Sequence, residues 1–173
     1  MMRPAKRPGL LRIIAFALDW FVIAAWGALL FGIVMLVSNG DPRGFSGPWM
    51  SQAVGFVSMT LPVTLYFSVM ESSRFSASIG KRLTGLRVRT THGDRLSFRW
   101  SLARTLIKFA PWELGHLVAQ QGMFSGDGGF AGWVYIPMLL SFLLPLWWVN
   151  SILFSGAAPY DRWTGVRVDV PTQ

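Results

Sequence analysis

The chain has 173 residues, of which 52% are hydrophobic and 14% are charged, and its net charge is +8. A soluble single-domain enzyme is a poor interpretation, because the apolar residues form runs as long as the roughly 20 residues that a helix needs to cross a bilayer. The absence of cysteine excludes disulfides, thiolate metal sites and cysteine nucleophiles. The length allows a single membrane domain, residues 1–173. In such a chain the positive charge indicates basic loops that face an anionic leaflet, and it argues against a nucleic-acid partner.

The first two apolar runs predict two membrane spans. The run at 13–37 is longer than the apolar region of a secretory signal, about 7 to 15 residues, and a polar turn follows it without a cleavage pattern. We therefore expect a retained span there. The run at 49–70 contains Pro62, an expected kink, and more polar side chains than a lipid-facing helix requires. Those side chains indicate that the second span is buried against neighbouring helices.

Two further membrane segments follow a basic loop at 71–102. The segment 103–121 opens with Arg104 and Lys108 among apolar side chains, a pattern typical of an interfacial helix. Pro111, Glu113 and His116 interrupt the remainder. The segment therefore either crosses as a kinked helix buried in protein or dips into the membrane and returns. The longer apolar run at 133–154 predicts another span, and a tail at 155–173 follows it.

The distribution of basic residues predicts the orientation of the chain. Most of the 16 lysines and arginines lie before the first span or between Arg74 and Lys108, and only Arg43 lies in the loop after the first span. The positive-inside rule then places the N-terminus, the loop 71–102 and the tail in the cytoplasm. Four crossings with both termini inside fit best. We therefore expect an all-α, polytopic helical membrane protein with about four membrane segments and a small basic cytoplasmic element.

A short internal repeat supports an even number of crossings. Residues 82–88, RLTGLRV, recur in the tail as residues 162–168, RWTGVRV, each copy following an apolar span. Each copy has a glycine that permits a turn, Gly85 or Gly165, and then an alternating stretch that favours a short strand, at 86–91 and 166–170. A turn at residues 92–94 would lead the first strand back into residues 95–98. The alternative is an ordinary basic loop beside the membrane.

Several elements together resemble a known family. They are Arg12 and Asp19 in the first span, Gly80–Val88 after the second, Arg104 in the third segment, and Tyr160–Gly165 after the last span. In this order they are similar to the RDD family of bacterial membrane proteins, over nearly the whole chain. The family is named for one arginine and two aspartates, which by this resemblance are Arg12, Asp19 and Asp161.

The resemblance implies a location in the bacterial cell (inner) membrane. It also implies a small transporter of an unidentified ligand, or a cation/proton antiporter. One residue departs from the family pattern, because the tail aspartate is commonly preceded by histidine and Tyr160 stands there in this chain. A proton-handling role of that histidine is therefore not carried over.

The residues themselves leave two interpretations of Asp19 open. A carboxylate two turns into an apolar span costs roughly 2.5 to 3.5 kcal/mol on the lenient scales, so it must have a partner. Asp19 is either a proton or cation site, or a buried anion locked by Arg12, Arg82 or Arg104. Its position nearer the cytoplasmic end than the midplane favours the structural interpretation. Asp161, beside Arg162 in the tail, could receive an arginine from the middle loop.

The basic cytoplasmic element supports a second function class. Its predicted members are Gly80, Lys81, Arg82, Gly85, Arg87, Arg104, Arg162, Gly165 and Arg167. Such an element could hold a soluble partner or anionic lipid in a scaffold or accessory protein. Four helices enclose little space, so a homo-oligomer is also expected.

No motif predicts an enzyme, a cofactor or a metal site. Glu113 and His116 share one helical face as half of a di-metal site would, but the sequence has no second copy of the pair. Gly80-Lys81 lacks the remainder of a phosphate-binding loop. We expect no catalytic residue, no metal and no cofactor.

Overall fold

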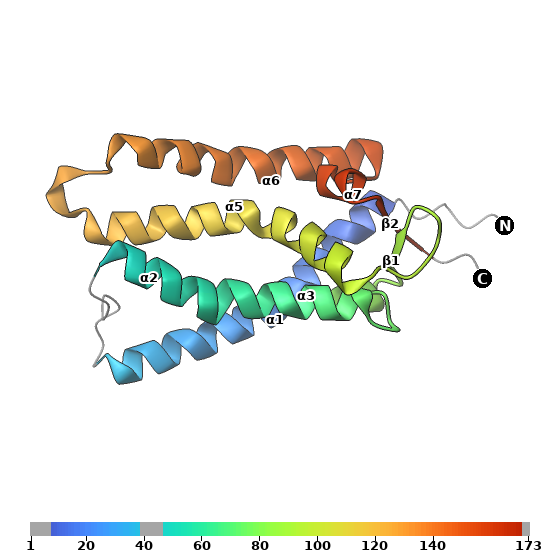
Figure 1. Cartoon of the computed structure of the whole chain (residues 1–173), viewed down its shortest axis with the longest axis horizontal. Coiled ribbons are helices and arrows are strands. Elements are labelled where there is room, and N and C mark those ends of the chain that lie inside the picture. The colour runs from blue at the N-terminus through green and yellow to red at the C-terminus, as the bar shows by residue number, and fades with distance from the viewer. Residues whose placement is uncertain (1–7, 39–46, 171–173) are drawn as a thin grey trace.

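The structure is a computed structural model, and it describes residues 8–38 and 47–170. Four long helical rods lie side by side in it (Figure 1). Their parts are α1 (Pro8–Val37), α2 (Pro48–Gly55) with the π turn η1 (Phe56–Thr60) and α3 (Leu61–Ser72), α5 (Phe98–Phe124), and α6 (Tyr135–Ser155). The shorter elements are α4 (Ile79–Leu83), β1 (Arg87–Thr90), η2 (Gly126–Gly128), η3 (Gly132–Val134), α7 (Pro159–Trp163) and β2 (Val166–Asp169).

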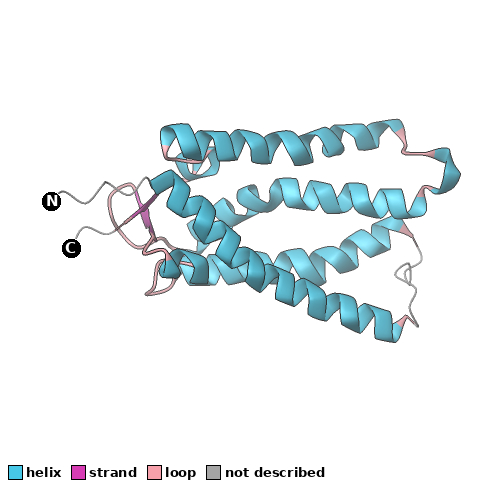
Figure 2. Cartoon of the chain, turned by 180° about the vertical axis from the view of Figure 1, so that it is seen from behind, coloured by secondary structure: helices cyan, strands magenta, loops and turns pink. Residues whose placement is uncertain are grey.

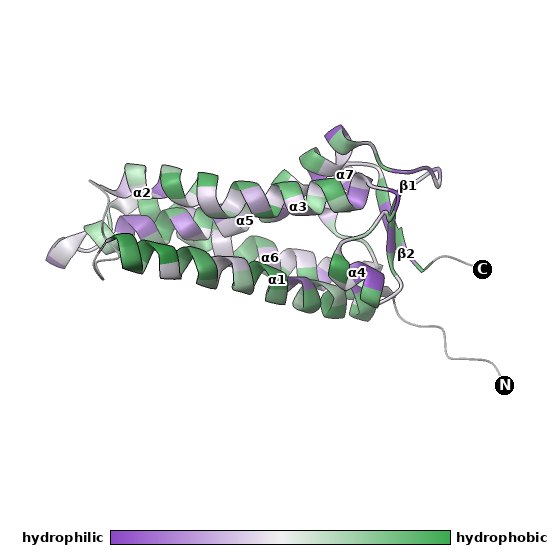
Figure 3. Cartoon of the chain, turned by 90° about the horizontal axis from the view of Figure 1, so that it is seen from below, coloured by the Kyte–Doolittle hydropathy of each residue, from purple (hydrophilic) through white to green (hydrophobic). Residues whose placement is uncertain are grey.

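Three of the rods are long and apolar enough to cross a membrane. They cover Gly9–Val37, Pro48–Ser72 and Gly132–Ser155, which agrees with the predicted spans at 13–37, 49–70 and 133–154. Large apolar side chains remain on their outer surfaces, as lipid-facing helices require, with Phe21 73% and Phe142 68% exposed. The hydrophobic colouring follows the rods and is strong along α1, whereas hydrophilic residues gather around α4 and the strands (Figure 3).

The third predicted segment is a continuous helix. α5 has 27 residues and passes through Pro111 without a break, so the alternative in which the segment dips in and returns is wrong. At 1.5 Å per residue it is about 40 Å long, enough to cover a hydrocarbon core. Its arginines, Lys108 and Glu113 give it a less apolar sequence than the other three rods.

The expected kink in the second rod is a π turn just before Pro62. In this turn the Leu61 N–H donates to the carbonyl of Phe56, five residues back. Proline has no N–H to donate, so a locally wider turn accommodates it while the rod continues from Pro48 to Ser72.

The two copies of the internal repeat pair with each other. β1 and β2 are antiparallel, with Val88 opposite Val168, and a view from behind shows them at the same end of the bundle as the start of α1 (Figure 2). Their apolar face packs on α1 at Ala15. The predicted return strand at 95–98 is reduced to a single bridge between Arg89 and Arg95, because α5 begins at Phe98.

The path of α1 is oblique to the other rods (Figures 1 and 2). Near its start, Gly9 lies against the backbone of Ile152 in α6. Further along, the Trp26 indole Nε1 donates to the carbonyl of Ser58 in η1, at 2.9 Å. α1 therefore leaves α6 as it crosses toward the second rod, and this divergence positions the cavity described below.

Candidate functional site

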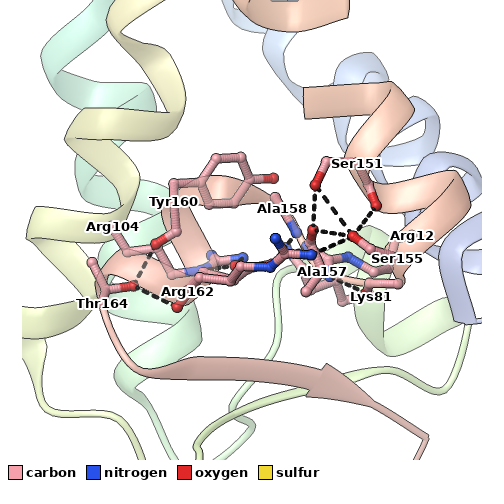
Figure 4. Close-up of polar contacts among 12 residues, drawn as sticks. Arg12, Lys81, Arg104, Ser151, Ser155, Ala157, Ala158, Tyr160, Arg162 and Thr164 are labelled. Carbon is pink, nitrogen blue, oxygen red and sulfur yellow. Dashed lines mark hydrogen bonds and ion pairs between the residues drawn. The ribbon is translucent and has the colours of Figure 1, made fainter. Parts of the chain in front are cut away.

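A buried ionic network joins five elements at the end of the bundle that carries the strands. At its centre is Arg104 of α5, whose side chain is 2% exposed. Arg104 Nη1 donates to Glu71 Oε2 at 2.5 Å, and Arg104 Nε donates to Asp161 Oδ1 at 2.7 Å. Lys81 of α4 donates to Glu71 Oε1 at 2.7 Å. Arg12 of α1 completes the network by donating to Asp161 Oδ2 and to the carbonyl of Gly156. Arg12, Lys81 and Arg104 converge beside α7 (Figure 4).

The short helix α7 presents Asp161 to both arginines. Pro159 sets the first turn, and the Ala158 N–H donates to Asp161 Oδ2 at 3.2 Å. Burial alone would raise the pKa of Asp161, but the charges of Arg104 and Arg12 outweigh it and lower that pKa. Asp161 is therefore a fixed anion within this network.

Tyr160, the residue before Asp161, packs over the network. Its ring lies 5.2 Å from the Arg104 guanidinium carbon and meets Trp148 edge-on, also at 5.2 Å. Burial, together with the neighbouring charge of Asp161, raises the pKa of Tyr160. The tyrosine ring therefore contributes an apolar cover and a cation–π contact to Arg104.

Asp19 lies outside this network, and none of Arg12, Arg82 and Arg104 pairs with it. The expectation that one of these arginines locks it is wrong. Arg12 is seven residues away along α1, about 10 Å, and is engaged by α7. Arg104 is engaged by two other carboxylates, and Arg82 lies over the Phe75 ring at 4.0 Å.

Neutral donors satisfy Asp19 instead. Its carboxylate is 0% exposed and accepts hydrogen bonds from the Ser78 hydroxyl at 2.5 Å, the Gly80 N–H at 2.8 Å and the Tyr66 hydroxyl at 3.2 Å. Gly80 is required by the close approach of α4 to α1, because a Cβ there would lie 2.0 Å from the carbonyl oxygen of Ala15. Asp19 therefore fastens α4 to α1.

The predicted basic element divides into buried and peripheral parts. Lys81 and Arg104 belong to the network, and Gly85 and Gly165 supply the positive-φ turns before the two strands. The other four arginines are peripheral. Arg82 lies over the Phe75 ring, Arg87 donates to the Phe75 carbonyl, Arg162 donates to the Ser155 hydroxyl, and Arg167 pairs with Asp169 at the surface.

Sequence reasoning missed Glu71, which is fully buried and pairs with both Lys81 and Arg104. A signal was available, because Glu71 is the only acidic residue in the 49–72 run and it stands next to the basic loop. Buried arginines require carboxylate partners, so an acid at that place is a natural candidate.

A cavity of about 910 Å³ lies between α1, α5 and α6. Four cations line one end of it, and His116 lines it further along α5. No acidic residue of the described part of the chain lines it, and its remaining walls are mostly apolar. The cations are Arg12, Lys81, Arg104 and Lys108, and the aromatic walls are Phe16, Trp20, Phe21, Phe109, Trp112, Phe142 and Trp148.

Lys108 differs from the other three cations of the cavity. Arg12, Lys81 and Arg104 each pair with a carboxylate, whereas no carboxylate in the described residues forms an ion pair with Lys108. Its ammonium nitrogen lies 3.7 Å from the centre of the Phe67 ring. An aromatic face stabilises a cation only partly, so the Lys108 ammonium is left without a carboxylate partner among the described residues.

Comparison with protein families gives one match, in which the RDD family model covers residues 8–165. No curated protein and no solved structure matches the chain.

Proposed function

This chain belongs to the RDD family, and we propose that it is a membrane protein that binds an anionic amphiphile. The anionic headgroup binds at Lys108, and the apolar part lies along the aromatic walls between α1 and α6. The family resemblance implied a ligand that it did not identify, and this proposal names the chemical class of that ligand.

The observation that carries the proposal is the unpaired charge of Lys108. Four cations line the cavity, whereas the described residues bury three carboxylates. The carboxylates are Asp19, Glu71 and Asp161, and all three are held by other groups. An uncompensated cation among apolar walls is costly, and a bound anion would offset that cost.

The shape of the cavity favours an amphiphile over a small anion. Lys108 lies one helical turn, about 6 Å, from Arg104 and faces a space whose further walls are aromatic. Phe21 and Phe142 line the cavity and are themselves 73% and 68% exposed. The cavity therefore opens on the surface that faces lipid, which lets an acyl chain enter from the side.

The proposal includes four crossings, with α5 as the crossing that hydropathy alone does not indicate. An even number of crossings places the start of α1, the paired strands and α7 on one side of the membrane. By the positive-inside rule that side is the cytoplasm, in keeping with the family's location in the bacterial cell membrane. Lys108 then lies on the cytoplasmic side of the bilayer midplane, one helical turn deeper than Arg104.

Cation/proton antiport at Asp19 is less well supported. Asp19 does not line the cavity, and three fixed donors from α3, α4 and the segment before α4 enclose its carboxylate. A coupling carboxylate needs a route for water or ions. We therefore assign Asp19 a structural role. We also propose that anionic lipid binds in the cavity and not at the basic loop, where the sequence led us to expect it.

The test measures lipid binding by the full chain in a neutral detergent. Bound phosphatidylglycerol and phosphatidylcholine with the same acyl chains are counted by native mass spectrometry. Replacing Lys108 with glutamine should weaken phosphatidylglycerol binding by about 10- to 100-fold, the range for a charge-assisted hydrogen bond worth about 1.5 to 3 kcal/mol. Arg99→Gln is the matched control, because it removes an exposed charge from the same helix. Equal binding by wild type and Lys108→Gln would refute the proposal.

A further inference from the structure

A polar cluster lies in the middle of the bundle, away from the ionic network. Glu113 of α5 accepts a hydrogen bond on Oε1 from the Gln52 amide of α2 and one on Oε2 from the Thr60 hydroxyl of η1, both at 2.5 Å. His116, one turn along α5, has its Nδ1 at 3.7 Å from Glu113 Oε2. Two ionisable groups thus lie together near the midpoints of the second rod and α5.

The hydrogen bonds determine which imidazole nitrogen can take up a proton. The Thr60 hydroxyl uses its single proton on Glu113, so its 3.5 Å contact with His116 Nδ1 requires a hydrogen on that nitrogen. Nε2, on the opposite edge of the ring, is then the basic position. His116 is also the titratable side chain on the cavity wall beyond Lys108. A proton taken up at Nε2 would change the charge of the cavity.

A purely structural role explains only part of this arrangement. Glu113 would join α2, η1 and α5 as a satisfied polar residue, but that role does not require an imidazole on the cavity wall. A metal centre does not fit either, because the described residues contain no group of three or more His, Cys, Asp or Glu side chains that could hold an ion. The π turn at Phe56–Thr60 supplies Thr60, and such turns are frequent at functional sites.

We propose that Glu113 and His116 form a proton-binding pair that regulates anion binding at Lys108. This inference rests on the proposed function. With His116 neutral the pair has a net charge of −1, and proton uptake at Nε2 brings it to zero. Binding of an anionic headgroup is therefore stronger when the pair is protonated.

The described elements around the pair hold few other ionisable groups. α2, η1 and α6 contain no Asp, Glu, Lys, Arg or His, and the ionisable groups of α3, Tyr66 and Glu71, bond to Asp19 and to the ionic network. In α1, Arg12 is likewise in the network and Asp19 is bound by α4. The nearest charged residue toward the cavity on α5 is Lys108.

The separation of the two sites determines the size of the effect. His116 and Lys108 are eight residues apart on α5, which is about 12 Å along the helix. A unit charge at that distance, with an effective dielectric constant of about 20, changes an equilibrium constant by about tenfold. We therefore expect phosphatidylglycerol binding to strengthen about tenfold as His116 becomes protonated.

The experiment repeats the lipid titration between pH 5 and pH 8. Phosphatidylglycerol is the probe because a phosphodiester keeps one negative charge throughout that range. Wild type should bind it about tenfold more tightly at the acidic end, and His116→Gln should abolish the pH dependence. Glu113→Gln should move the midpoint to lower pH, because the imidazolium loses its carboxylate partner. His92→Gln is the matched control, since His92 is the other histidine of the chain and lies exposed in the turn after β1.

The outcomes separate this inference from the proposed function. Binding that depends on Lys108 but not on pH would overturn the regulation and leave the headgroup site intact. It would also be overturned by a pH dependence that His92→Gln removes, or by one whose midpoint Glu113→Gln leaves unchanged. Binding that ignores Lys108 would overturn the proposed function itself. If His116→Gln does not fold, the midpoint shift in Glu113→Gln still decides the question.

Discussion

Replacing Arg104 with glutamine should destabilise the chain by about 3 to 5 kcal/mol. Arg104 bridges Glu71 and Asp161, and both carboxylates are 0% exposed. The substitution leaves Glu71 with Lys81 alone and Asp161 with Arg12 alone. Two charge-assisted hydrogen bonds worth about 1.5 to 3 kcal/mol each sum to about 3 to 6 kcal/mol, and losing one partner of a buried ion pair costs about 3 to 5 kcal/mol.

The free energy of unfolding can be measured by titrating the purified chain from a mild detergent into a denaturing one and following tryptophan fluorescence. Arg99→Gln, an exposed change on the same helix, should stay within about 0.5 kcal/mol of wild type. The combined Arg104→Gln and Glu71→Gln change should cost about 0.5 to 3 kcal/mol less than the sum of the two single changes, because both remove the same ion pair. A loss below about 1 kcal/mol for Arg104→Gln, or strictly additive effects of the two changes, would refute this account of the network.

The same substitution should alter the acid stability of the chain. Burial opposes ionisation of Asp161, but Arg104 and Arg12 together lower its pKa below the usual value of 3.8. A lowered folded-state pKa contributes stability above pH 3.8, and that contribution is lost as the pH falls through the folded value. Without Arg104 the pKa of Asp161 is depressed less, so the contribution is smaller and disappears at higher pH. Unfolding free energies between pH 7 and pH 3 measure both effects.

Three other changes test separate features of the structure. Gly80→Ala should cost at least about 1 to 3 kcal/mol, because its Cβ would meet the α1 backbone, whereas Gly32→Ala, with nothing within 4 Å, should be neutral or stabilising in the same unfolding assay. Asp19→Asn should cost about 1 to 3 kcal/mol of unfolding free energy, because it disturbs the hydrogen bonds from fixed donors. The antiport interpretation would be restored if the Asp19→Asn chain were stable but had lost cation-dependent proton flux in proteoliposomes. Because the chain has no cysteine, Thr91→Cys and Asp127→Cys can each be labelled alone, and an impermeant thiol reagent should reach them from opposite sides of the membrane if α5 crosses it.

The apolar runs predicted most of the fold because their length is itself the physical requirement. A run such as 133–154 has few ways to satisfy its backbone in lipid other than a helix. The strands were predictable for a local reason as well, since Gly85 and Gly165 permit the turns and the residues after each alternate in polarity. α5 was harder to interpret, because its charged residues resemble an interfacial helix until their partners in the fold are known.

The partners of the charged residues could not be predicted from spacing. Helical periodicity gives the residues that share a face with Asp19, but not that Gly80 of a loop helix packs on that face. Glu71 looked like an ordinary polar residue at the end of a span, and its burial depends on the meeting of α3, α4 and α5. The isolation of Lys108 required both facts, because the other cations pair with Glu71 and Asp161 while neutral donors hold Asp19.

The charged groups of this bundle therefore differ in what their substitution should affect. Arg104 and Asp19 have fixed partners inside the protein, so their free energy of interaction is already part of folding, and changes there should appear as lost stability. His116 lines the cavity along α5, and Lys108 lines it without a carboxylate partner among the described residues. A cation of that kind destabilises the empty protein and becomes favourable only when an anion arrives. Removing the charge of Lys108 should therefore spare the fold and weaken binding, the opposite of what a purely structural lysine would show.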